Sequence, residues 1–124
     1  MTDTILIIDD NEDILEFLSE VLGDTYKLHL AASGELAQAI LESEIVDLII
    51  SDIMMPYVSG LEIVAYIQEN FQEKKIPVII LSGMGQEDIV LEAFQLGADD
   101  FITKPFSPSE LSVRVKRFSF LSAR

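Results

Sequence analysis

The segment Ile5-Leu6-Ile7-Ile8-Asp9-Asp10 places a run of four apolar residues directly before two carboxylates. A short apolar run rich in β-branched residues is typical of a central parallel strand that is buried on both faces. Residues 46–51 and 77–81 are interpreted in the same way, and Pro77 is tolerated because it stands at a strand start. Residues 26–30 alternate apolar and polar side chains, which predicts an edge strand.

Helical patterns occupy the intervals between these strands. The first helix carries an apolar stripe at helical spacing, formed by Ile14, Phe17, Leu18, Val21 and Leu22. The predicted boundaries are starts at Ser33, Ser59, about Gln86 and Ser107, and ends at Gly23 and Gly97. The chain therefore alternates strand and helix five times.

This alternation in a chain of 124 residues predicts one domain over residues 1–124. The expected fold class is α/β, a (βα)5 doubly wound, five-stranded parallel sheet in the flavodoxin-like order 2-1-3-4-5. In such sheets, ligands bind beyond the carboxyl ends of the strands, at the switch point between the first and third strands. Candidate site residues should therefore follow those strands.

The chain is strongly acidic, and its charge is unevenly distributed. It carries 22 acidic residues against 8 Lys and Arg, a formal net charge of −14. We therefore expect no direct binding of nucleic acid or of an anionic membrane, since both require a basic surface. Residues 101–124 are the exception, with five bases and one acid. This basic terminal helix is either an ordinary solvated surface or a face turned toward a partner.

Two features that the sequence lacks bear on the chemistry and the cellular location of the protein. The chain has no cysteine, which excludes disulfides, thiolate metal sites and cysteine nucleophiles. It also shows neither a leader pattern nor a stretch of about 18 apolar residues that could span a membrane. We therefore expect a cytoplasmic protein.

Polar side chains gather where the predicted strands end. Asp9 and Asp10 follow the first strand, and Asp52 ends the third. Ser82 ends the fourth strand and Lys104 follows the fifth. Because the carboxyl ends of parallel strands meet at one rim of the sheet, we expect these five side chains to converge.

The same rim excludes sites that cradle a nucleotide phosphate. Those sites place glycines after the first strand, so that phosphate can approach the backbone amides. Residues 9–13 instead read Asp-Asp-Asn-Glu-Asp, which repels phosphate. Dinucleotide, P-loop and flavin-phosphate sites are therefore excluded.

The chemistry of the rim predicts a phosphoryl acceptor. Neighbouring carboxylates repel one another, and a hard cation such as Mg²⁺ relieves that repulsion with oxygen ligands. With metal bound at Asp9, Asp10 and Asp52, a carboxylate oxygen of Asp52 could attack a phosphoryl donor and form an aspartyl phosphate. Lys104 would share the charge developing on the phosphoryl oxygens, and Ser82 offers a hydroxyl donor.

Five short motifs follow the predicted strands in order. They are Ile7-Ile8-Asp9-Asp10, Asp52-Ile53-Met54-Met55-Pro56, Leu81-Ser82-Gly83, Gly97-Ala98-Asp99-Asp100-Phe101 and Thr103-Lys104-Pro105-Phe106. Together they resemble the receiver domains of two-component response regulators, the CheY-like family. The resemblance covers Ile5 to about Phe118, nearly the whole chain.

The resemblance implies how the acidic residues act. Asp52 would be phosphorylated by a sensor histidine kinase or a phosphotransfer domain. Asp9, Asp10 and Asp52 would bind Mg²⁺ or Mn²⁺, with the backbone carbonyl of Met54 as a further ligand.

The resemblance also implies a switch. Ser82 and Lys104 would contact the phosphoryl group, the Lys104–Pro105 bond would be cis, and Phe101 would be the switch aromatic. Two features depart from common family patterns: the hydroxyl residue is Ser rather than Thr, and the aromatic is Phe rather than Tyr. The inward state of Phe101 can therefore make no hydroxyl hydrogen bond, and its coupling must come from packing.

We therefore expect a signalling switch and not an enzyme, taking part only in its own phosphorylation and dephosphorylation. Phosphorylation would change the surface formed by the helix over 86–96, the strand before Lys104 and the helix from Ser107, and so control an output partner or effector domain. We expect no effector domain within this chain, which would make it a stand-alone regulator or the N-terminal part of a larger protein. The resemblance implies that dimers through this surface often use a basic residue on the helix over 86–96, which here carries acids and no base. We therefore expect the unphosphorylated chain to be monomeric or weakly associating.

Two other functions compete with this interpretation. A haloacid-type phosphohydrolase also uses an aspartyl nucleophile, but it needs a second Asp two residues on at the end of the first strand, and Asn11-Glu12 do not supply it. A receiver-like module that binds partners without phosphorylation is the other alternative. The complete set of acceptor, acidic, hydroxyl and lysine residues argues against it.

Overall fold

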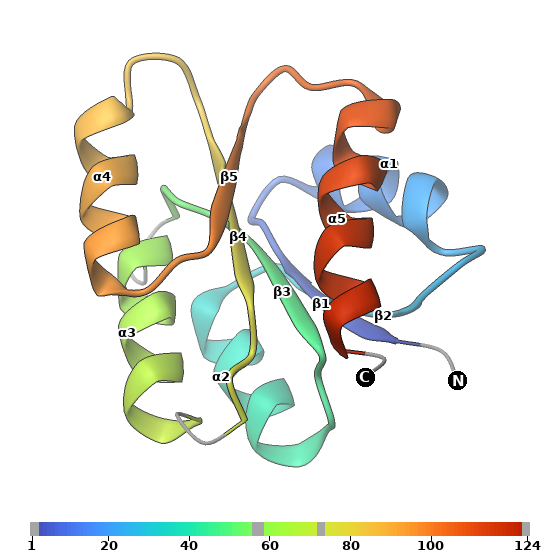
Figure 1. Ribbon diagram of the computed structural model, residues 1–124, viewed down its shortest axis with the longest axis horizontal. Coiled ribbons are helices and arrows are strands. Elements are labelled where there is room, and N and C mark those ends of the chain that lie inside the picture. Colours follow the sequence, from blue (N-terminus) through green and yellow to red (C-terminus); the bar gives the residue numbers. More distant parts are fainter. Residues whose placement is uncertain (1–2, 56–58, 72–73, 123–124) are drawn as a thin grey trace.

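The structure is a computed structural model, and it describes residues 3–55, 59–71 and 74–122. Pro56 of the motif over 52–56 and the basic Arg124 lie outside these residues. Strands and helices alternate along the described chain (Figure 1): β1 (Thr4–Ile8), α1 (Glu12–Leu22), β2 (Lys27–Ala31), α2 (Gly34–Ser43), β3 (Leu48–Asp52), α3 (Gly60–Asn70), β4 (Val78–Ser82), α4 (Glu87–Leu96), β5 (Asp100–Thr103) and α5 (Pro108–Ser122). Within the described ranges, no helix is both long and apolar enough to cross a membrane.

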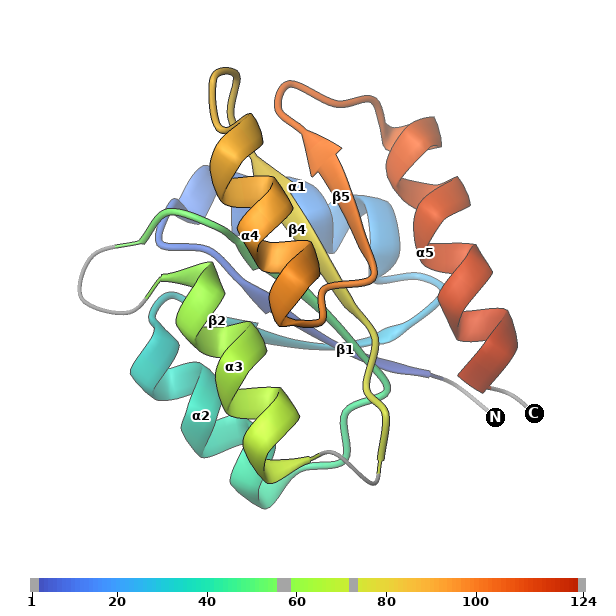
Figure 2. The same ribbon diagram turned by 60° about the vertical axis from the view of Figure 1, so that its left-hand side comes forward.

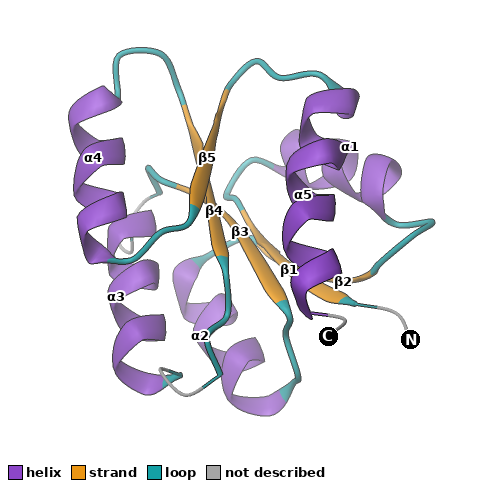
Figure 3. Ribbon diagram, viewed as in Figure 1, coloured by secondary structure: helices purple, strands orange, loops and turns teal. Residues whose placement is uncertain are grey.

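The strands form one parallel sheet in the order β2-β1-β3-β4-β5, as the sequence predicts (Figure 3). β1 lies between β2 and β3, so that Ile7 pairs with Leu30 on one side and Ile50 on the other. Every residue of β1, β3 and β4 is buried, whereas β2 at the sheet edge is partly exposed. The interpretations of the apolar runs as central strands and of the alternating run as an edge strand are both confirmed.

Each face of the sheet carries its own apolar core. Successive side chains of a strand point to opposite faces. Leu6 and Ile8 of β1 therefore pack with α2, α3 and α4, whereas Ile5 and Ile7 pack with α1 and α5. Figures 1 and 2 show these two groups of helices on opposite sides of the sheet. Because the central strands are held from both sides, the positions of their carboxyl ends are well defined.

Side-chain caps start four of the five helices. The predicted caps of α2, α3 and α5 are confirmed, each accepting a hydrogen bond from the backbone N–H three residues later: Ser33, Ser59 and Ser107. In α1 the cap is Asn11, whose Oδ1 accepts from the N–H of Asp13 at 2.9 Å. The cap residue is itself held by Asp9, whose Oδ1 accepts from the N–H of Asn11 at 2.9 Å.

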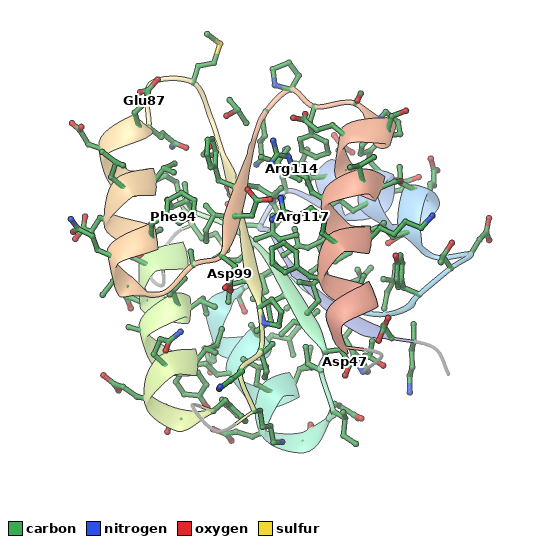
Figure 4. The ribbon with its side chains drawn as sticks, in the orientation of Figure 1. Asp47, Glu87, Phe94, Asp99, Arg114 and Arg117 are labelled. Carbon is green, nitrogen blue, oxygen red and sulfur yellow. The ribbon has the colours of Figure 1, made fainter. Side chains whose placement is uncertain are left out.

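An ion pair ties the edge strand β5 to α5. The carboxylate of Asp100, which is 8% exposed, accepts from Arg114 Nη1 at 2.8 and 2.9 Å. Arg117 lies 3.5 Å from the same carboxylate, and both arginines reach from α5 toward β5 in Figure 4. Arg114 also lies 3.7 Å from Glu110. Much of the basic charge of the last helix is thus balanced within the domain.

The start of α3 lies directly against the end of β3. The N–H of Gly60 donates to the carbonyl of Ile53 at 2.9 Å. A Cβ at Gly60 would lie 2.6 Å from the carbonyl oxygen of Asp52 and 2.7 Å from the Cα of Ile53. Both are backbone atoms, which cannot turn aside as a flexible side chain can. Only glycine therefore permits this approach to the strand end that carries Asp52.

We predict that Gly60→Ala lowers the free energy of unfolding by about 1–3 kcal/mol, the usual cost of forcing an extra carbon into a packed site. Gly83→Ala is a matched control, because a Cβ there would meet only the Gln86 side chain, at 3.5 Å. Denaturant titration of both variants checks the prediction. Equal losses in the two variants, or no loss in Gly60→Ala, would contradict it.

Candidate functional site

The carboxyl ends of β1 and β3 bring three carboxylates together. Asp9 follows β1 and is fully buried, and Asp52 ends β3 and is 8% exposed. Asp10 is exposed at the outer side of the same cluster. One carboxylate oxygen of each residue lies within 4.8 Å of the other two. The expected convergence of these acids on one rim is therefore present.

Lys104 is the cation of this cluster. Its Nζ donates to Asp9 Oδ2 at 3.2 Å and to Asp52 Oδ1 at 3.3 Å. Its backbone N–H donates to the carbonyl of Ser82 at 2.7 Å, so the residue contacts the ends of three strands. The Lys104–Pro105 peptide bond is cis, as the resemblance implies.

The electrostatics of the cluster favour an added cation. Burial raises the pKa of Asp52 above its ordinary value, and the Asp9 carboxylate raises it further, whereas Lys104 lowers it. Burial alone would lower the pKa of Lys104, but the carboxylates of Asp52 and Asp9 outweigh burial and raise it. Lys104 is therefore charged at neutral pH. The ionised form of Asp52 is less stable in the folded protein than it would be in water.

The donor atoms of the cluster fit a hard divalent cation. Mg²⁺ takes oxygen ligands and is usually bound by one or two carboxylates together with waters. Asp9, Asp10 and Asp52 supply such oxygens, and among the described residues the cluster consists of these carboxylates, without a sulfur or imidazole ligand. Met54, two residues after Asp52, is half exposed and lies in the loop that leaves this strand end.

Ser82 and Phe101 lie on one face of the sheet. Ser82 ends β4 and is 2% exposed. Phe101 on β5 pairs in register with Ile80, and Ile80 stands two residues before Ser82. Phe101 is 37% exposed, and this partly exposed arrangement is called its outward state below.

Two side-chain contacts near this site could not be predicted from the sequence. Asp100 belongs to a motif read from the sequence, but its pairing with Arg114 joins elements that only the folded chain brings together. Phe94 of α4 contacts the ring of Phe101, with ring centroids 5.9 Å apart. The aromatic character of Phe94 was the only available signal, and helical spacing alone could not identify its partner.

A separate hollow lies at the opposite end of the sheet. Its volume is about 710 Å³, and Asp47 and Asp99, labelled in Figure 4, line it. Asp47 Oδ2 accepts from the N–H of Thr4, and Asp99 Oδ2 accepts from the N–H of Val78. Both carboxylates are thus occupied by backbone N–H groups where β1 and β4 start. The rim at the strand ends is therefore the better candidate site.

The similarity of the chain to known proteins extends over nearly its whole length. The model of the family described as "Response regulator receiver domain" matches residues 5–116. The chain is 40% identical over 112 residues to the "Probable cyclic di-GMP phosphodiesterase" of Vibrio cholerae, spanning 90% of this chain and 25% of that protein. It is 39% identical over 114 residues to the phosphate regulon transcriptional regulatory protein PhoB of Pseudomonas aeruginosa, spanning 91% of this chain and 50% of PhoB.

A solved structure shows the same fold. The chemotaxis protein CheY4 of Vibrio cholerae superimposes with a TM-score of 0.88 at 30% identity, over 95% of this chain and 99% of CheY4. The chain thus spans a quarter to a half of the two curated relatives above, and nearly all of a protein that consists of this fold. On this evidence the chain belongs to the response regulator receiver domain family.

Proposed function

We propose that the chain is a phosphorylation-dependent switch in which Asp52 accepts a phosphoryl group from the phosphohistidine of a sensor histidine kinase or phosphotransfer domain. One observation carries the proposal: Lys104 Nζ joins the carboxylates of Asp9 and Asp52 at 3.2 and 3.3 Å within a cluster of three acids. This arrangement combines a nucleophile, acidic metal ligands and a cation for the phosphoryl oxygens, and membership of the receiver family supports the same roles.

The proposed step is a simple displacement. A carboxylate oxygen of Asp52 forms a bond to phosphorus while the phosphorus–nitrogen bond of the donor breaks, and the electron pair of that bond returns to the imidazole. The Lys104 ammonium, already beside this carboxylate, pairs with the transferred phosphoryl oxygens, and the Ser82 hydroxyl donates to one of them. Mg²⁺ bound at Asp9, Asp10 and Asp52 would offset the negative charge of carboxylates and phosphoryl group.

The phosphoryl group is proposed to act through Ser82 and Phe101. Drawing Ser82 toward a phosphoryl oxygen would vacate space on the face that it shares with Phe101, which would then rotate inward. The surface of α4, β5 and α5 changes as a result and controls a partner or an effector domain. The relatives are named for transcriptional regulation and for cyclic di-GMP hydrolysis, so receivers of this kind accompany different outputs.

The charges on this surface support weak self-association at most. α4 presents Glu87, Asp88 and Glu92, whereas Arg114 of α5 is already paired with Asp100. The unphosphorylated domain is proposed to be monomeric or weakly associating, with its output surface available to other partners.

We predict that phosphate is incorporated at Asp52 alone and only with Mg²⁺. Wild type incubated with acetyl phosphate and Mg²⁺ should gain the mass of one phosphoryl group, while Asp52→Asn, or wild type in EDTA, should gain none. Asp24→Asn removes an exposed carboxylate in the loop between α1 and β2, at the end of the sheet where the strands start, and should behave as wild type. Full incorporation in Asp52→Asn would refute the assignment, and none in wild type would favour a phosphorylation-independent binding module.

A second prediction concerns stability and pH. The pKa of Asp52 is higher in the folded protein than in the unfolded chain. The Asp52 carboxyl therefore contributes to stability at a pH below its unfolded pKa, and this contribution is lost as the pH rises through its folded pKa. In EDTA at pH 7, Asp52→Asn should therefore be more stable than wild type, and the difference should shrink toward pH 4. Mg²⁺ at about 100 times its dissociation constant should add about 2.7 kcal/mol to wild type and less to the variant. Denaturant titrations across pH check this, and a wild type more stable than Asp52→Asn in EDTA would contradict it.

A third prediction concerns phosphate lifetime. In the receiver geometry, the residues two after the phosphoacceptor and two after the hydroxyl residue flank the path of the attacking water, and both are methionines, Met54 and Met84. A thioether cannot orient water as a polar side chain can, so the aspartyl phosphate should be long-lived. Met54→Asn should speed phosphate loss by about tenfold, equivalent to about 1.4 kcal/mol of barrier. Met84 is 84% exposed, so Met84→Glu should act less strongly than the change at Met54.

Release of phosphate from purified phospho-protein at fixed Mg²⁺ measures these rates, with the double variant included. Unchanged rates in all variants, or loss within seconds from wild type, would show that the methionines do not shield the phosphate.

A further inference from the structure

The rings of Phe94 and Phe101 form an edge-to-face pair across the gap between α4 and β5. Their centroids are 5.9 Å apart and their planes are inclined by 85°. Perpendicular contact of this kind is favourable because the positive edge of one ring meets the negative face of the other. Phe94 is 38% exposed and Phe101 37% exposed, so each ring covers part of the other at the surface. Figure 4 shows Phe94 on the side of α4 that faces β5.

The packing contacts of α4 are mainly with α3 and β4. The buried residues of α4 are Val90 and Ala93, both small, and the helix packs chiefly on α3. Its start has no side-chain cap, because the side chain of Gln86 accepts from the N–H of Gly83 instead. Among the aromatic pairs of the described residues, Phe94–Phe101 is the pair that joins α4 to β5. Phe94 is therefore the aromatic neighbour of Phe101 on α4.

We propose that Phe94 is a positioning residue that holds Phe101 in its outward state and so sets the energetic cost of phosphorylation. The proposal rests on the switch role of Phe101 in the proposed function. Phe101 has no hydroxyl group to anchor either state, so ring contacts decide its position. Moving inward would break the edge-to-face contact, and that loss must be offset by the phosphoryl group.

If Phe94 stabilises the outward state of Phe101, the wild-type domain has a lower apparent affinity for phosphoryl ligands. When the competent state is a minor fraction of the population, the apparent dissociation constant is the intrinsic constant divided by that fraction. Removing a contact made only in the outward state raises the fraction. The strength of an edge-to-face pair corresponds to about a two- to tenfold change in the equilibrium.

Titration with beryllofluoride and Mg²⁺, a phosphoryl mimic, tests the proposal. Phe94→Ala should bind beryllofluoride about two- to tenfold more tightly than wild type, and Phe94→Leu should tighten by a smaller factor because it keeps bulk but loses the ring. Phe94→Tyr keeps the ring and should restore the wild-type affinity. Leu91→Ala is the matched control, since Leu91 lies one turn earlier on α4 and is 61% exposed, and it should leave the affinity unchanged.

A double-variant cycle separates positioning from a general loosening of α4. In the Phe101→Ala background, Phe94→Ala should have no further effect on beryllofluoride affinity. NMR signals of the Phe101 ring should also shift in Phe94→Ala before any ligand is added. The proposal is overturned if Phe94→Ala binds as wild type does, if Leu91→Ala tightens equally, or if the effect persists without the Phe101 ring. Wild type that binds no beryllofluoride would instead overturn the proposed function, and the role of Phe94 in it.

Discussion

The two hydrogen bonds of Lys104 to Asp9 and Asp52 are the interaction on which the site depends. Three carboxylates within 4.8 Å repel one another, most strongly where water is excluded, and two of them are buried. Parallel strands packed on both faces leave the backbone little freedom to separate these charges. The ammonium group compensates part of the repulsion and leaves an excess of negative charge, which suits the cluster to a divalent cation. The raised pKa of Asp52 reflects the same balance.

Most of the fold could be predicted because its determinants are local. The β-branched runs mark β1, β3 and β4, the alternating run marks the edge strand, and serines mark three of the helix starts. Strand limits were less accurate: the predicted strand over 46–51 is Leu48–Asp52 in the structure. This shift arises because register with neighbouring strands, and not composition, decides which residues pair. The convergence of the site residues followed from the geometry of parallel sheets.

Side-chain partners between distant elements could not be predicted. The basic residues of the last helix suggested a free charged face, but Arg114 is held by the buried carboxylate of Asp100. Counting residues gives the charge of the helix, but it cannot show that the charge of Arg114 is paired with a carboxylate of the same domain. Likewise, Phe94 fits the apolar pattern of its helix, yet its contact with Phe101 depends on how α4 is placed against β5. Both contacts lie on the surface that the switch is proposed to change, where local sequence patterns carry the least information.

The wide spacing of the site along the chain has a consequence for its biosynthesis. Asp9 and Lys104 are 95 residues apart, and the lysine follows the last strand of the sheet. A ribosome releases the chain from its N-terminus, so all three carboxylates emerge well before the cation that compensates them. A nascent chain that has completed β3 carries Asp52 but neither Ser82 nor Lys104. The complete set of site residues is therefore present only after the last strand of the sheet has been synthesised.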